Sequence, residues 1–470
     1  MNLNHKPDLI DNYGRIKFDI HNHIDRDLSI NKEEDASMYD PIHPHDLKSL
    51  KKDSIMIRSN YLTKNEKKLY LHLVNFNNTI NRVKIDDPED INVRKLIPLL
   101  IDLSMSPMFN IHVVSLSILA TLTYMFKDIV DELITNKFYE SINMNLQEPF
   151  FNEQRHVFRW IYNFISTHPE MSQDLLEKVT VEQIYETAIE YIASTSDDYA
   201  QNLFYTISTV PNLTYKQAKK CIQFFYYFIS IPNKKGKKFA LLGIHSIISN
   251  QNYPQDKRKQ FIEMIGIEHL VAQYIMQDEI SRKQGFAIAL FGDLIALGYF
   301  NHLYLIPKIL QLSSDQSLTK WYKEILFCTI KTILFYCDQD TIMDIWRTGY
   351  IHHLIKEKET ADFSLNIEIS FCYTSFINKI VQSELINFIN KESFDIINSI
   401  SYTDNHHLMI SLVNAIIRLI NFAEENNLTN ALYDSILNAD CFIAFEDTLS
   451  REAVPVELAT ALQEKLDKLK

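Results

Sequence analysis

The chain has 470 residues and a net charge of −13, which disfavours general binding to nucleic acids or anionic membranes because both attract cationic proteins. Hydrophobic residues make up 46% of the chain and charged residues 23%, so it can bury a large core and is not disordered as a whole. Glycine occurs only 8 times, which weighs against an α/β-barrel enzyme, whose loops turn back over a parallel sheet and use glycine freely.

The first 60 residues are polar and contain several prolines, so we expect a flexible N-terminal arm over residues 1–60. The remaining residues, 61–470, are expected to form one folded domain, whose first helix is predicted from Thr63 to Asn77.

Within this arm the stretch FDIHNHID, residues 18–25, resembles the opening of metal-dependent amidohydrolases, where two histidines at the end of a first strand bind a metal ion. The later strands that would supply the other ligands are not predicted, so His21 and His23 cannot complete a zinc site. The histidines are then either incidental residues of a polar arm or weak metal ligands together with His43 and His45. We predict no metal site and no cofactor.

The chain has five cysteines, an odd number without a C-x-x-C pair, which is typical of a reducing compartment. The N-terminus has no apolar signal region, and no stretch approaches the roughly 18 unbroken apolar residues of a membrane span. We therefore expect an intracellular protein, in the cytoplasm or the nucleus, without a membrane span.

Apolar residues recur with a helical period through residues 92–450, and alternating strand patterns are absent. Val181, Ile184, Ala188, Ile189 and Ile192, for example, form one stripe along a helix. Hinge residues recur at intervals of 44, 86, 83 and 91 residues, which correspond to one unit followed by three double units. The predicted hinges are Asn136, Thr180, Gly266, Gly349 and Asp440, with weaker ones at Thr214, Gly298 and Lys391.

The strongly apolar helices before these hinges recur too, and Asn163, Tyr205 and Ser246 align within them at steps of 42 and 41 residues. A unit of about 40 to 47 residues built from two or three helices is the period of armadillo and HEAT repeats. The chain resembles the armadillo family in this period and in the phrase FIEMIG, which precedes a hinge glycine at Gly266. The resemblance implies an all-α fold, a right-handed α-solenoid of about eight repeats in which a long third helix such as VFRWIYNFIS lines a concave face.

Importin-α-type armadillo proteins are the nearest named comparison, since their third helices carry a tryptophan followed by an asparagine that together hold an extended basic peptide. Here WIYN supplies Trp160 and Asn163, but they are three residues apart rather than four, and Trp321 is followed by Glu324 with no asparagine nearby. The ladder is broken after its first step. A divergent nuclear import adaptor is therefore kept only as the alternative function.

We predict that a protein or an extended peptide binds along the third helices. The alternative is that the tryptophans are core residues, because aromatic side chains on apolar helices are usually buried. The predicted binding residues are Trp160, Asn163, Tyr205, Ser246, Trp321 and Glu324.

Lysines concentrate in YKQAKK, NKKGKK and DKRK, within an otherwise acidic chain. They either solvate loops between helices or line up as a positive strip for an acidic peptide, a phosphate group or an RNA backbone. The predicted basic patch consists of Lys216, Lys219, Lys220, Lys234, Lys235, Lys237, Lys238, Lys257, Arg258 and Lys259.

No phosphate-binding loop, nucleophile elbow, zinc-protease motif or kinase signature occurs in the sequence. We therefore predict no catalytic residues and no enzymatic activity. The predicted function is a non-enzymatic scaffold or adaptor that binds a protein or an extended peptide along its concave surface.

Overall fold

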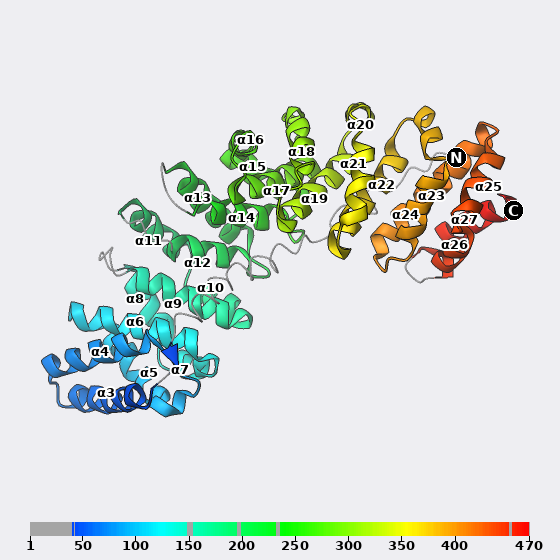
Figure 1. Cartoon of the computed structure of the whole chain (residues 1–470). Helices are drawn as coiled ribbons and strands as arrows, with labels where there is room; N and C mark the ends of the chain where they lie inside the picture. Colours follow the sequence, from blue (N-terminus) through cyan, green and yellow to red (C-terminus); the bar gives the residue numbers. More distant parts are fainter. Residues whose placement is uncertain are drawn as a thin grey trace. The chain divides into compact units, whose positions relative to one another are not determined.

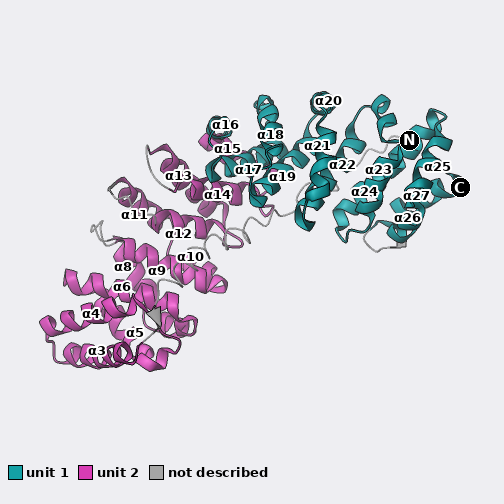
Figure 2. Ribbon diagram, viewed as in Figure 1, with its two compact units in different colours: residues 1–20, 268–470 teal, residues 21–267 magenta. Residues whose placement is uncertain are grey.

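The structure is a computed structural model that describes residues 40–41, 43–147, 154–194, 199–231, 236–450 and 454–469. Over these ranges helix dominates, and the only strands are β1 (Asp40–Pro41) and β2 (Val83–Lys84), which pair in parallel with Asp40 opposite Val83. The predicted all-α class is thus confirmed. Figure 2 shows two compact units, and we call them in chain order the first unit (residues 21–267, magenta, labelled unit 2) and the second unit (residues 268–470, teal, labelled unit 1).

The first unit, residues 21–267, contains a layer of helices that pack side by side in sequence order (Figure 1). We call these the third-helix layer: α4 (Glu66–Ile80), α6 (Phe109–Met125), α9 (Gln154–Thr167), α12 (Tyr199–Ser208) and α14 (Lys237–Ile248). The other helices of this unit are α3 (Pro44–Leu62), α5 (Val93–Leu103), α7 (Val130–Thr135), α8 (Phe138–Gln147), α10 (Ser172–Lys178), α11 (Val181–Ser194), α13 (Tyr215–Ser230) and α15 (Gln255–Ile265). Of these, α3, α5, α8, α11, α13 and α15 contact helices of the layer. Short 3-10 turns join some of them: η1 (Pro88–Ile91), η2 (Lys127–Ile129) and η3 (Pro169–Met171).

The second unit repeats this arrangement. Its third-helix layer consists of α17 (Arg282–Ala296), α19 (Lys320–Tyr336), α22 (Phe363–Lys379), α24 (His406–Glu425) and α27 (Val456–Leu469). The remaining helices are α16 (Ile267–Ile275), α18 (Ile306–Ser313), α20 (Gln339–Arg347), α21 (Tyr350–Thr360), α23 (Lys391–Ser401), α25 (Thr429–Asn438) and α26 (Cys441–Ser450), with 3-10 turns η4 (Leu303–Leu305) and η5 (Gln382–Phe388). The helix triplet α20, α21 and α22 has the short, short and long pattern of an armadillo repeat, and repeats of this kind stack as a solenoid.

The predicted flexible arm is too long, because its last part is the helix α3. Pro44 stands at the start of this helix, where its missing N–H costs nothing, and Leu50 and Ile57 are buried against the rest of the unit. The helix predicted from Thr63 to Asn77 is α4, which begins at Glu66 with Asn65 as its N-cap. His21 and His23, for which no metal site is predicted, lie outside the described residues.

Several helices begin at a side chain that accepts a backbone hydrogen bond from the first turn. Thr180 and Thr214, predicted as hinges, are such residues, since each hydroxyl accepts the N–H of a glutamine three residues later, Gln183 and Gln217. Both glutamine side chains accept the threonine N–H in return, which completes a capping box. Lys391 is the first residue of α23, which Asn390 caps. These three positions are helix starts and not left-handed hinges.

The true hinges between the first and second helix of a repeat adopt left-handed backbone angles, with φ between 52° and 74°: Asn92, Lys137, Gly266, Gly349 and Asp440. The hinge predicted at Asn136 thus lies one residue later. Gly298 is left-handed as well, but it follows α17, at the end of a repeat. Three of the five hinges are not glycine, which explains how repeats of this kind form in a chain with so few glycines.

Close helix packing builds the core between the layers. At Gly243 of α14 an added Cβ would lie 2.2 Å from the ring of Phe225 in α13, so only glycine allows this approach. Phe204 and Phe224 stack beside it with ring centroids 3.9 Å apart.

By length and hydropathy α24 could cross a membrane. Helix α6 meets this test only together with the segment Lys127–Thr135 that follows it, and the two are bent by 118° relative to each other. In the structure 61% of the α24 window is buried against other helices. Packing within the repeat stack accounts for its apolar character.

Candidate protein-binding surfaces

The predicted anchor residue Trp160 lies in the core of the first unit. Its side chain is 0% exposed, its indole N–H donates to Thr123 Oγ1 of α6 at 3.0 Å, and its ring packs edge-on against Phe138. Asn163 is 3% exposed and its amide donates to the Ala120 carbonyl at 2.7 Å. Both polar groups donate hydrogen bonds from α9 to α6, so the exposed indole and amide of a peptide-binding ladder are not observed at these two residues.

Asn163, Tyr205 and Ser246 lie in the consecutive helices α9, α12 and α14, as their spacing predicts. Tyr205 is buried, with its ring 6.1 Å from that of Phe239, and Ser246 is half-buried. The three residues therefore occupy successive third helices, but the first two face neighbouring helices. Their role in binding stays a prediction, and their burial gives it no support.

In the second unit Trp321 is half-buried between α17 and α19. Its ring stands edge-on to Phe286 at 5.3 Å and covers Gly285, where an added Cβ would lie 2.9 Å from the ring. Glu324 is buried, and Lys320 lies 3.7 Å from it. These contacts are structural, and a ligand role for the two residues likewise stays a prediction.

The predicted basic patch does not lie on one helix layer. Lys216, Lys219 and Lys220 begin α13, and Lys257, Arg258 and Lys259 lie in the first turns of α15, both outside the third-helix layer. Lys237 and Lys238 begin α14, which belongs to that layer, and the Lys237 ammonium donates to the Ile229 carbonyl at the far end of α13. A 16-residue helix is about 24 Å long, so the α14 lysines are remote from those at the start of α13. Lys234 and Lys235 lie outside the described residues.

Much of the α13 and α15 cluster is engaged within the protein. Lys216 pairs with Glu182 at 3.0 Å, Lys220 lies over the Tyr185 ring, and Lys257 lies over the Tyr215 ring. Arg258 is buried. The cluster therefore joins neighbouring repeats as well as solvating their ends.

A different set of side chains faces solvent from the third-helix layer. On α9 the residues with exposed or half-exposed side chains include Arg155, Arg159, Tyr162 and Ser166, besides His156 and Thr167. The first four are spaced by four, three and four residues, which is one stripe along a helix. Asn202 and Thr206 of α12 and Lys238 and His245 of α14 are half-exposed at matching spacing, so the stripe continues across three helices.

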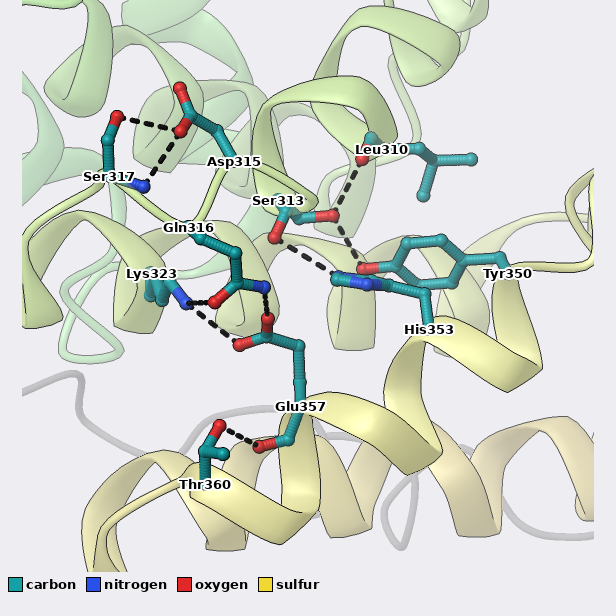
Figure 3. A network of polar contacts seen from close by, with 10 residues as sticks. All are labelled: Leu310, Ser313, Asp315, Gln316, Ser317, Lys323, Tyr350, His353, Glu357 and Thr360. Atoms are coloured by element: carbon teal, nitrogen blue, oxygen red, sulfur yellow. Dashed lines mark hydrogen bonds and ion pairs between the residues drawn. The ribbon is translucent and has the colours of Figure 1, made fainter.

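In the second unit a network of polar side chains joins α18, α19 and α21 (Figure 3). The Lys323 ammonium donates to Glu357 Oε2 at 2.9 Å and to Gln316 Oε1 at 3.2 Å, and the Gln316 amide donates to Glu357. The two charged side chains are 11% and 2% exposed. Burial opposes ionisation of Glu357, but the hydrogen bonds from Lys323 and Gln316 together outweigh it and hold the pKa of this carboxyl below its usual value.

The second half of this network has residue types that occur in catalytic sites, but not their geometry. The Ser313 hydroxyl donates to the Leu310 carbonyl at 2.8 Å and lies 2.8 Å from the Tyr350 hydroxyl. His353 Nε2 lies 3.1 Å from the Ser313 carbonyl oxygen rather than from its hydroxyl (Figure 3), so the histidine is not placed as a base for the serine. Burial lowers the pKa of His353 in spite of the nearby Glu357 carboxylate. The network connects repeats and shows no nucleophile and base pair.

A second buried ion pair lies within the third-helix layer of the same unit. The Lys331 ammonium of α19 donates to Glu368 Oε2 of α22 at 2.6 Å, and both side chains are nearly buried. Lys331 also lies over the Phe371 ring. The positive charge of Lys331 is therefore paired inside the protein.

Among the described residues no group of three or more histidine, cysteine or acidic side chains is placed to hold a metal ion. The five cysteines are free thiols, and burial raises the pKa values of all of them. Thiols in this state are poor nucleophiles.

No protein-family model and no curated protein sequence matches the chain. Among solved structures, an engineered protein is similar with a TM-score of 0.60 and 12% identity, over 79% of this chain and 98% of the engineered one. A designed armadillo repeat protein is also similar, with a TM-score of 0.41 and 14% identity over 53% of this chain and 99% of that protein. The first likeness shows a shared helical fold. Helical-repeat folds of this kind generally serve to bind other proteins and are usually not catalytic.

The solvent-facing arginines of α9 were not among the predicted binding residues, which were chosen from the adjacent WIYN motif. Arg155 and Arg159 are four residues apart, which already places them on one helical face. A count of basic and acidic residues on each predicted third helix would have identified them, whereas the prediction considered only the lysine-rich stretches.

Proposed function

We propose that the chain is a non-enzymatic scaffold or adaptor whose third-helix layer binds a protein or an extended peptide. The observation that carries this proposal is the stripe of exposed and half-exposed polar side chains that runs across α9, α12 and α14. An extended segment can cross several helices of such a layer and contact one stripe residue on each. Intracellular location, in the cytoplasm or the nucleus, belongs to the same proposal.

The alternative function, a divergent nuclear import adaptor, requires exposed indoles and amides along this layer. Trp160 and Asn163 are buried and bonded to α6, so no observation favours this alternative.

Site-specific photo-cross-linking tests the proposal. A benzophenone amino acid is placed at Tyr162, on the stripe, or at Tyr226 of α13, which is 46% exposed and lies outside the third-helix layer. We expect protein adducts in extracts, identified by mass spectrometry, from position 162 and few from position 226. Equal adducts at both positions, adducts only at 226, or none at 162 would overturn the proposal.

A further inference from the structure

The third-helix layer of the first unit is free of acidic residues over four consecutive helices. Helices α6 and α12 carry no charged side chain of Asp, Glu, Lys or Arg, α9 carries Arg155 and Arg159, and α14 carries Lys237 and Lys238. These four helices thus carry four basic residues and no acidic residue, within a chain whose net charge is −13. The acid-free stretch begins at α6, since the preceding α4 has Glu66 in its first turn.

The acidic residues of this unit are concentrated on the other helices, among them Asp131, Glu140, Asp174 and Glu182. The third-helix layer of the second unit is different too, because its Lys331 is neutralised by Glu368 within the layer. The absence of acidic residues is therefore specific to the third-helix layer of the first unit. A layer can be solvated without it, as the second unit shows.

The two arginines of α9 keep their positive charge available to a ligand. No carboxylate pairs with either guanidinium within the described part of the chain, and Arg155 Nε donates only to the neighbouring His156 at 3.3 Å. Burial is the largest cause that lowers the pKa of His156, to about 3, and the two arginines add to it, so the imidazole is a neutral acceptor. Both guanidiniums lie on the solvent-facing stripe described above.

Next to these arginines the stripe offers uncharged groups that suit a polypeptide backbone. Asn202 of α12 is half-exposed, although its amide oxygen is buried, and Thr206, also half-exposed, lies one helical turn further on. Amides and hydroxyls bond the N–H and C=O groups of an extended chain. Helices pack about 10 Å apart, so four of them span about 30 Å, the length of about nine extended residues.

We propose that this acid-free surface of α6, α9, α12 and α14 binds an extended acidic peptide segment of a partner protein. Arg155 and Arg159 bind its carboxylates, and the half-exposed side chains of Asn202 and Thr206 bond its backbone. The inference rests on the proposed function and names the chemistry of the partner. A peptide fits better than a nucleic acid, because a phosphate backbone needs a longer row of cations than the two arginines of α9 supply.

Fluorescence anisotropy with a labelled 12-residue peptide of alternating glutamate and serine tests the proposal, with glutamine–serine and lysine–serine peptides as comparisons. We expect the acidic peptide alone to bind the full chain, with an affinity that falls as salt is raised. The double variant Arg155→Glu, Arg159→Glu should weaken binding by about tenfold or more, because it removes two favourable charge contacts and adds two repulsive ones. Arg155→Lys, Arg159→Lys should retain most of the binding.

The matched control is Lys48→Glu, Lys52→Glu, which reverses two exposed charges at the same four-residue spacing on α3, outside the layer. It should change the affinity less than twofold, roughly the size of a long-range charge effect. An equal loss in this control, no binding of the acidic peptide, or tighter binding of single-stranded RNA than of the peptide would overturn the inference. Cross-linking at position 162 that survives the arginine reversal would leave the scaffold function standing while the acidic-partner inference fails.

Discussion

At the scale of single residues, whether an aromatic side chain of α9 is buried or exposed depends on its position around the helix and not on its residue type. Trp160 and Tyr162 are aromatic residues two positions apart on α9, yet the first lies in the core and the second faces solvent. Successive positions on a helix differ by about 100°, so residues two positions apart are rotated by about 200° and lie on opposite faces. The burial of Trp160 agrees with the alternative that the tryptophans are core residues and gives the predicted ligand-binding indole no support.

Replacing Trp160 with alanine should lower the free energy of unfolding by about 3 to 5 kcal/mol, because it leaves a cavity and removes the hydrogen bond that the indole donates to Thr123. Tyr162→Ala on the same helix should change it by only about 0.5 kcal/mol. Urea unfolding followed by circular dichroism measures both. Similar values for the two variants would place the indole outside the core.

The Lys323 and Glu357 pair should be strongly coupled. Glu357→Gln leaves a buried ammonium without its counter-charge and should cost about 3 kcal/mol at neutral pH, whereas Lys323→Met combined with Glu357→Leu should cost much less. Chemical unfolding of wild type, single variant and double variant measures this. A double variant as unstable as the single one would contradict the assignment.

The same pair predicts a pH dependence. The folded pKa of Glu357 lies below its unfolded value, so its contribution to stability is complete above about pH 4.5 and is lost as the pH falls through the folded pKa. Thermal unfolding between pH 6 and pH 3 should therefore show a steeper loss of stability in wild type than in Glu357→Gln. Identical slopes would show that the carboxylate is not stabilised in the fold.

At the scale of elements, the helices themselves were well predicted and their junctions less so. The 3.6-residue period locates the third helices because their apolar stripes are buried on one side. The junctions were harder, since a threonine can end one helix as a hinge or begin the next as a cap, and Thr180 and Thr214 do the latter. Left-handed turns at Lys137 and Asp440 carry no glycine signal at all.

Two glycines of the second unit test the hinge assignment with the same chemical change. Gly349 has φ of 74°, and an added Cβ would meet nothing closer than His352 at 3.9 Å, so Gly349→Ala should cost about 1 kcal/mol of backbone strain alone. Gly292 lies inside α17 with ordinary contacts to Thr329, and Gly292→Ala should stabilise by about 0.5 kcal/mol. Differential scanning calorimetry should therefore show shifts of opposite sign, and shifts of equal sign would refute the hinge assignment.

At the scale of the whole molecule, the sequence predicted the fold class and the repeat period but not the surface that we assign to binding. Periodicity reports burial, and burial determines the layers. The charge of a surface depends on which helices form it, and the basic residues on α13 and on α14 become separate only once α13 is seen as a long helix between them. The division into two units likewise has no marker in composition, since no linker rich in proline or glycine lies near residue 267.

Hydrogen–deuterium exchange of the full chain, with and without a saturating concentration of the acidic 12-residue peptide, tests the central claim most directly. The account predicts slower amide exchange in α9, α12 and α14, whose solvent-facing stripe the peptide would cover, and unchanged exchange in α8, α11 and α13. Protection confined to α8, α11 and α13, or spread evenly over both layers, would contradict a binding surface on the third-helix layer.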